Sequence, residues 1–133
     1  MRPLHYVLPL LLFSIITGQH AWGKSPYSEK ALNKLYCDSI GGQTETKHDY
    51  HFPNGAQHYV LIDCETDNEV IEAGLDRYSS LDCVQQVLFF HQLTGKKPVI
   101  VIYDSDGMMG QYEYRLKTSI RSISMIDLKI IKI

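Results

Sequence analysis

The stretch Tyr59-Val-Leu-Ile-Asp-Cys-Glu-Thr-Asp-Asn-Glu-Val-Ile-Glu-Ala-Gly-Leu75 contains two short apolar runs separated by polar residues. Apolar runs bounded by turn residues are typical of buried strands. A two-residue turn at Asp67-Asn68 places Asp63 of the first strand directly opposite Glu72 of the second. Paired residues share one face, with Cβ atoms about 5 Å apart, and two like charges there repel unless a cation or a proton lies between them. A three-residue loop without a bulge would instead put the two acids on opposite faces.

The first 23 residues have the features of a secretory signal peptide. Arg2 supplies a positive charge, Tyr6 to Ile16 is mostly apolar, and Ala21-Trp22-Gly23 offers small residues where a signal peptidase cleaves. The apolar run is short for a membrane span, which needs about 20 residues. We expect cleavage after Gly23, export to the periplasm or the exterior, and a single domain over 24–133 without a stable membrane span. A retained membrane anchor is the alternative.

The mature chain would be mildly acidic and would keep all three cysteines. Twelve basic and fifteen acidic residues follow Gly23, which gives a formal net charge of −3. This balance does not favour non-specific binding to nucleic acid, which usually requires a basic surface. An exported protein can form one disulfide among Cys37, Cys64 and Cys83, but their spacing does not indicate the pair. The chain has no Cys-x-x-Cys and no His/Cys cluster with zinc spacing.

The pattern of apolar residues, caps and turn residues predicts three helices and five strands. The expected helices run from the Ser28 cap to about Ser39, from a cap at Ser79 or Ser80 to Thr94, and from Gln111 to about Ile123. The expected strands cover 43–52, 58–64, 69–73, 97–103 and 125–133, and Gly74 is expected to weaken or end the third. A meander of three strands followed by crossover connections indicates an α/β fold with a mixed sheet flanked by helices.

Several short motifs follow one another along this αβββαβαβ order. They are Gly41-Gly42-Gln43-Thr44-Glu45, Ile62-Asp63-Cys64-Glu65-Thr66-Asp67, Val70-Ile71-Glu72, Gln86-Val87-Leu88-Phe89-Phe90 and Thr94-Gly95-Lys96-Lys97-Pro98. Each motif is short and common, so a resemblance to a known family depends on the order and spacing of the motifs. The set resembles the core of the PD-(D/E)XK nuclease-like (restriction-endonuclease-like) superfamily, and especially its small exported bacterial members. The similarity covers about Glu29 to Tyr103.

This resemblance implies a restriction-endonuclease-like core and metal-dependent hydrolysis of nucleic-acid phosphodiesters. By the same resemblance, Asp63 and Glu72 would bind Mg²⁺ or Mn²⁺, and Glu29 on the first helix would add a third carboxylate. Gln86 would complete the catalytic set from the following helix. Such chemistry requires oxygen ligands, because Mg²⁺ is held by one or two carboxylates together with water and substrate phosphate. The metal lowers the pKa of its water and neutralises charge in the transition state.

The chain departs from the family pattern two residues after Glu72. The family has a lysine there, which orients the attacking water and stabilises charge, whereas this chain has Gly74. Asp76, Arg77 and Lys96 are near in sequence, but none occupies the strand position of that lysine. Either another cation substitutes, with nucleic acid as the partner, or the domain is a catalytically inactive secreted module that binds a protein partner.

Two other arrangements are weaker. Val99 to Gly107 resembles the strand and Asp-x-Asp nucleophile of haloacid-dehalogenase phosphatases, but the further Lys and Asp motifs of that fold are missing, and Asp104-Ser-Asp-Gly favours a turn. A nucleophilic pair of Cys83 and His91 would be about 12 Å apart along one helix. Histidines 48, 51 and 58 fit an exposed strand face.

Overall fold

The computed structural model describes residues 27–133, so the expected signal peptide lies outside the described residues. The helices are α1 (Glu29–Ser39), α2 (Leu81–Thr94) and α3 (Gln111–Ser119), which continues as the 3-10 turn η1 (Ile120–Ser122). The strands are β1 (Gln43–His51), β2 (Gln57–Glu65), β3 (Glu69–Leu75), β4 (Lys97–Asp104) and β5 (Asp127–Lys132). Within 27–133, no helix is long and apolar enough to span a membrane.

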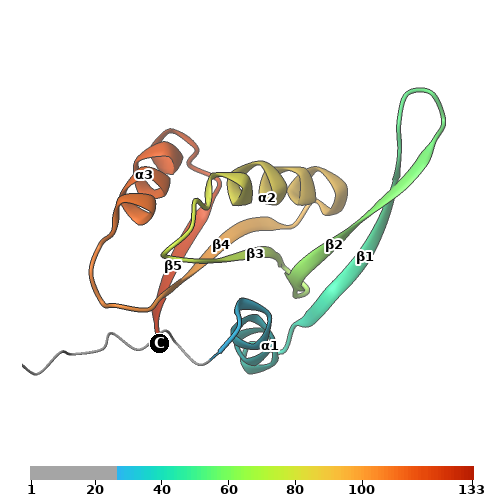
Figure 1. The fold of residues 1–133 in the computed structure, drawn as a ribbon. Coiled ribbons are helices and arrows are strands. Elements are labelled where there is room, and N and C mark those ends of the chain that lie inside the picture. The colour runs from blue at the N-terminus through green and yellow to red at the C-terminus, as the bar shows by residue number, and fades with distance from the viewer. Residues whose placement is uncertain (1–26) are drawn as a thin grey trace, which may run out of the picture.

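The five strands form one mixed sheet in the order β1-β2-β3-β4-β5. The first three are antiparallel neighbours, whereas β3, β4 and β5 run parallel. Figure 1 shows α1 on one face of the sheet, α2 and α3 on the other, and the β1–β2 hairpin extending beyond the helices. The expected α/β fold with a mixed, helix-flanked sheet is therefore confirmed at this level.

The core lies on both faces of β3 and β4. On one face, Leu32 and Cys37 of α1 pack with Val99 and Val101 of β4. On the other face, residues of α2, α3 and η1 pack against Ile100 and Ile102. The alternate residues of β4 therefore serve two separate cores, which explains why its sequence is a continuous β-branched run instead of an alternating one.

The largest differences between predicted and observed boundaries concern three elements. The third strand does not end at Gly74, because Gly74 pairs with Ile102 in the parallel ladder and β3 continues to Leu75. The absence of a side chain at residue 74 allows Ser80 to pack closely against the strand, since a Cβ at Gly74 would lie 2.9 Å from the Ser80 Oγ. The third helix is shorter than expected and finishes as η1, and the last strand begins at Asp127 instead of Met125.

A disulfide between Cys37 and Cys64 joins α1 to β2, with both residues fully buried. Cys83 remains a free, buried thiol. Gly42, in the turn between α1 and β1, packs directly on the disulfide. A Cβ at Gly42 would lie 2.7 Å from the Cys37 Sγ and 2.8 Å from the Cys64 Sγ. The turn can reach its position against the disulfide only because residue 42 has no side chain.

We predict that Gly42→Ala lowers the free energy of unfolding by about 1–3 kcal/mol, because the added methyl group overlaps both sulfur atoms. Urea denaturation of the oxidised protein measures the loss. The same substitution in a Cys37→Ala/Cys64→Ala background serves as the control, and there it should cost less, since the sulfur atoms are gone. An equal cost in both backgrounds would contradict the explanation.

Candidate active site

The candidate site lies where β2 parts from β3. The predicted two-residue turn is present, since the Thr66 N–H donates to the Glu69 carbonyl oxygen at 3.0 Å. The ladder then contains only the pairs Glu65–Val70 and Cys64–Ile71. The next pair in this register would be Asp63 and Glu72, but it does not form a ladder pair. Instead, the Asp63 Oδ2 accepts a hydrogen bond from the Ala73 N–H at 3.0 Å.

Other elements bring the remaining predicted residues to this junction. Ser28 caps α1 by accepting a hydrogen bond from the Ala31 N–H at 3.2 Å, and this helix start carries Glu29. The Glu29 carboxylate at this helix start lies near the backbone of Leu75 at the end of β3, and this backbone group lowers its pKa. Gln86 of α2 contacts the Glu72 carboxyl group. All four residues predicted for the site therefore belong to one neighbourhood, although they come from four elements.

Three carboxylates in this neighbourhood have raised pKa values. Burial, together with the charges of Asp63 and Glu29, raises the pKa of Glu72 to about 8. Burial also raises the pKa of Asp63, with a contribution from Glu45, although the bond from the Ala73 N–H opposes the change. The pKa of Glu29 is raised by burial and by Asp63, and the charge of Arg77 opposes this. The site thus concentrates negative charge that the protein compensates only in part.

The Gln86 side chain of α2 reaches the Glu72 carboxyl group, with its amide nitrogen facing both carboxylate oxygens. Gln86 therefore supplies a hydrogen-bond donor to the acid whose pKa burial raises to about 8.

A cavity of about 390 Å³ opens beside the acids and is lined by Glu29, Asn33 and Asp63 among others. The Asn33 Nδ2 donates to the Asp63 carbonyl oxygen at 2.8 Å, while its buried Oδ1 has no partner. Glu45, in β1 beside Asp63, has a φ of 54° and is the only non-glycine residue with positive φ in the described part of the chain. Such backbone strain is often retained at functional sites.

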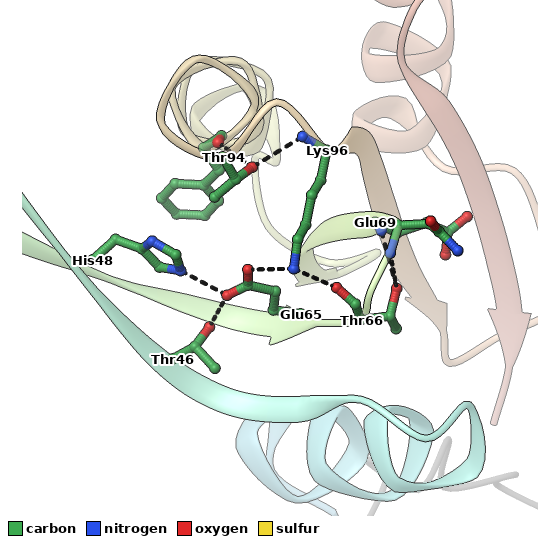
Figure 2. Close-up of polar contacts among 9 residues, drawn as sticks. Thr46, His48, Glu65, Thr66, Glu69, Thr94 and Lys96 are labelled. Atoms are coloured by element: carbon green, nitrogen blue, oxygen red, sulfur yellow. Dashed lines mark hydrogen bonds and ion pairs between the residues drawn. The ribbon is translucent and has the colours of Figure 1, made fainter.

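Sequence reasoning missed a second polar cluster, which fixes the β2–β3 turn (Figure 2). The Lys96 Nζ donates to the Glu65 Oε1 at 2.7 Å and to the Thr66 carbonyl oxygen at 2.6 Å. The Thr46 hydroxyl and the His48 Nε2 contact the other carboxylate oxygen of Glu65, at 2.6 and 2.7 Å. Burial alone would raise the pKa of Glu65, but these hydrogen bonds lower it to about 2. The quoted motifs contained Glu65 and Lys96, yet no local spacing indicates their contact.

A separate group of three acids lies at the carboxyl ends of β3 and β4. Among residues 27–133, the group of three acids whose oxygen atoms all lie within 4.8 Å is Asp76, Asp104 and Asp106; Glu29, Asp63 and Glu72 do not form such a closed group. The Asp104 Oδ1 accepts the N–H of Asp106 at 3.2 Å and that of Gly107 at 2.7 Å, so this segment is the predicted turn. A metal could bind this group, but the hydrogen bonds within the loop already explain why the three carboxylates lie close together.

Cys83 and His91 do not form a nucleophilic pair. The Cys83 thiol faces the Ala73 carbonyl oxygen, and burial beside Glu72 raises its pKa to about 12. The His91 Nδ1 contacts the Lys96 carbonyl oxygen at 2.7 Å.

Searches against protein-family models, curated proteins and solved structures found no match for this chain.

We predict that Glu72→Gln stabilises the metal-free protein at pH 8. The raised pKa of Glu72 means that its contribution is fully present below the unfolded pKa of 4.5 and is lost as the pH rises through about 8. The glutamine variant avoids this loss, so its free energy of unfolding should be greater by about 4 kcal/mol at pH 8, from a pKa change at about 1.4 kcal/mol per unit. Urea unfolding in a chelator from pH 5 to 8 measures the difference. Asp49→Asn, at an exposed position of β1, should leave the wild-type pH dependence unchanged.

We predict that Lys96→Met costs about 2 kcal/mol at pH 7, because it removes a charged donor from the part-buried Glu65. The pKa of Glu65 is lowered by its partners, so its contribution is present above pH 4.5 and is lost as the pH falls through about 2. The difference between variant and wild type should therefore shrink between pH 4.5 and 2 in urea unfolding. Lys97→Met breaks only an exposed pair with Asp127 and should cost less than about 1 kcal/mol.

Proposed function

We propose that this chain is an exported domain with a restriction-endonuclease-like core that hydrolyses nucleic-acid phosphodiesters with Mg²⁺ or Mn²⁺. Asp63 and Glu72 would hold the metal, with Glu29 as a third carboxylate and Gln86 as a partner of Glu72. The observation that carries the proposal is that acids from separate elements meet at one junction: the Asp63 carboxylate accepts the Ala73 N–H next to the buried Glu72, and Gln86 contacts Glu72. A divalent cation would compensate the charge of these acids.

The donor set fits a hard cation. Carboxylate oxygens from β2 and β3 are the ligands that Mg²⁺ prefers, and two of them suffice when water and substrate phosphate complete the shell. When bound, the metal would lower the pKa of a water molecule and neutralise charge on the phosphate.

The residues of the chain would position the carboxylates and exchange protons with solvent. The Ala73 N–H holds the Asp63 carboxylate, so the backbone of β3 orients this acid, and the Glu29 carboxylate lies near the Leu75 backbone on the same strand. Glu29 is exposed, so its carboxyl group can exchange protons with solvent. The disulfide between α1 and β2 supports export, because such bonds persist in oxidising compartments.

A second function is favoured by the packing around Gly74. Its side-chain position is filled by the Ser80 Oγ, the Ile102 Cδ1 and the Cys83 Sγ, at 2.9, 3.4 and 3.5 Å from a Cβ built there. A lysine at 74 would displace this packing, so the strand cannot supply the usual cation. If no other cation replaces it, the domain would be a catalytically inactive secreted module that binds a protein partner.

We predict that the purified mature protein nicks supercoiled plasmid with Mg²⁺ or Mn²⁺, and that Asp63→Asn lowers the rate by about 100-fold or more. This variant keeps an acceptor for the Ala73 N–H, so the fold should persist. Agarose-gel assays of nicking measure the rates, with Asp49→Asn as the surface control and circular dichroism as the test of folding. Equal nicking by wild type and Asp63→Asn, or none by wild type with either metal, would favour the inactive module.

A further inference from the structure

The cavity of about 390 Å³ lies between α1 and the hairpin of β1 and β2, on the face of the sheet that α1 covers (Figure 1). Its volume is in the range of small-molecule sites, which is about 300–1,000 Å³. Glu29 of α1 and Asp63 of β2 line the cavity and also belong to the acidic site. A ligand in the cavity would therefore lie beside a metal held by these acids.

The cavity opens where the pairing of β1 with β2 is interrupted. The flanking residues of each strand pair with one another, whereas Glu45 and Asp63 between them form no ladder pair. From α1, the Asn33 Nδ2 donates to the Asp63 carbonyl oxygen at 2.8 Å. Asn33 is only 7% exposed, and its Oδ1 has no hydrogen-bond partner within residues 27–133. Most buried polar atoms have a partner, so the lining contains an acceptor that the protein leaves unused.

Two lysines of α1, Lys30 and Lys34, line the same cavity and are one helical turn apart. The Lys30 Nζ pairs with the Glu45 Oε1 at 2.6 Å. The Lys34 Nζ pairs with the Asp38 Oδ2 at 2.8 Å, and Asp38 is not part of the cavity lining. The two lysine side chains are 79% and 66% exposed, so these ion pairs contribute little to stability and can be exchanged for another anion.

We propose that Lys30 and Lys34 bind a phosphate of the nucleic-acid substrate in this cavity, beside the metal site. Other lysine positions near the acids do not serve this purpose, because position 74 is closed by packing and Lys96 is held by Glu65. A lysine ammonium group binds phosphate as a compact point charge. The inference rests on the proposed function, and it names the part of the site that holds the substrate backbone.

The charges of the lining make phosphate binding depend on the metal. Two lysines and three acids line the cavity, so its formal net charge is −1, and a divalent cation on the acids would make it +1. The metal therefore turns a lining that repels an anion into one that attracts it. By linkage, the phosphate and the metal should each strengthen the binding of the other.

The experiment separates phosphate binding from metal binding and from catalysis. Fluorescence anisotropy measures the affinity of the mature protein for a labelled DNA duplex across a salt series. One series contains Ca²⁺ in place of Mg²⁺, and another contains a chelator at matched ionic strength. Calorimetric titration with Mn²⁺ alone measures the metal site.

The variants are Lys34→Gln and the double variant Lys30→Gln/Lys34→Gln, with two matched controls. Asp38→Asn breaks the same ion pair as Lys34→Gln but keeps the lysine. Lys117→Gln removes an exposed lysine of α3, on the opposite face of the sheet (Figure 1).

We expect Lys34→Gln to weaken DNA binding about 5-fold with Ca²⁺ and to lower the slope of log affinity against log salt by about 1. The double variant should lose about 20-fold and lower the slope by about 2. Two unrelated duplex sequences should show the same losses, because phosphate contacts carry no sequence information. Asp38→Asn should keep or raise the affinity, and Lys117→Gln should change it less than about 2-fold.

The wild type should bind DNA more weakly with the chelator than with Ca²⁺, and Mn²⁺ affinity should not fall in the lysine variants. Wild-type DNA affinity and salt slope in the double variant would overturn the inference, while plasmid nicking by the wild type would leave the proposed function standing. An equal loss in Asp38→Asn would show that the ion pair supports α1 and that Lys34 does not hold the substrate. Equal affinity with Ca²⁺ and with the chelator would reject the link between cavity and metal. Failure of the wild type to bind Mn²⁺ would reject the proposed function, and this inference with it.

Discussion

The separation of β2 from β3 after two ladder pairs is the constraint on which the candidate site depends. A continued ladder would occupy the Ala73 N–H with a backbone carbonyl group; instead, the N–H donates to the Asp63 carboxylate. The side chain thereby takes over a backbone hydrogen bond at the point of separation. This exchange keeps the N–H satisfied, as burial requires, and it holds Asp63 near Glu72 without the direct opposition of a ladder pair.

Two long-range contacts hold this junction on either side. The disulfide binds Cys64 to Cys37, so the residue next to Asp63 is joined to the helix that carries Glu29 and Asn33. The Lys96 side chain connects Glu65 and Thr66 to the turn between α2 and β4. Both contacts cross between elements that the sheet alone would not connect, because β2 makes so few ladder bonds to β3. The positions of the acids therefore depend on the packing of α1, the sheet and α2 together, and not on the β2–β3 hairpin alone.

The charge balance of the site follows from the same packing. Gly74 allows Ser80 and Cys83 of the α2 region to lie close against β3, which buries Glu72 and excludes a lysine from the strand. Burial with two neighbouring acids then raises the pKa of Glu72 to about 8. Asp63 and Glu29 therefore meet Glu72 without a lysine on β3 to balance their charges. Close packing at one glycine thus accounts for both the missing lysine and the unbalanced acids.

Local sequence determined the elements and their order. The β-branched run of β4, the Asp67-Asn68 turn and the Ser28 cap each follow from short-range preferences, and all three occur in the structure. Gly74 shows the limit of such reasoning: a glycine weakens an isolated strand, but here the parallel ladder with β4 outweighs that cost.

Only the tertiary structure decided which residues meet at the site. The pairing of Cys37 with Cys64 could not be chosen from spacing, because it depends on where α1 packs against the sheet. Lys96 reaches Glu65 across 31 positions of sequence, and Gln86 contacts Glu72 because α2 packs against β3. Short-range propensities carry no information on such contacts, since they arise when hydrophobic faces bring distant segments together. The sequence therefore determined the candidate acids, and the packing of α1, α2 and β3 decided their environment.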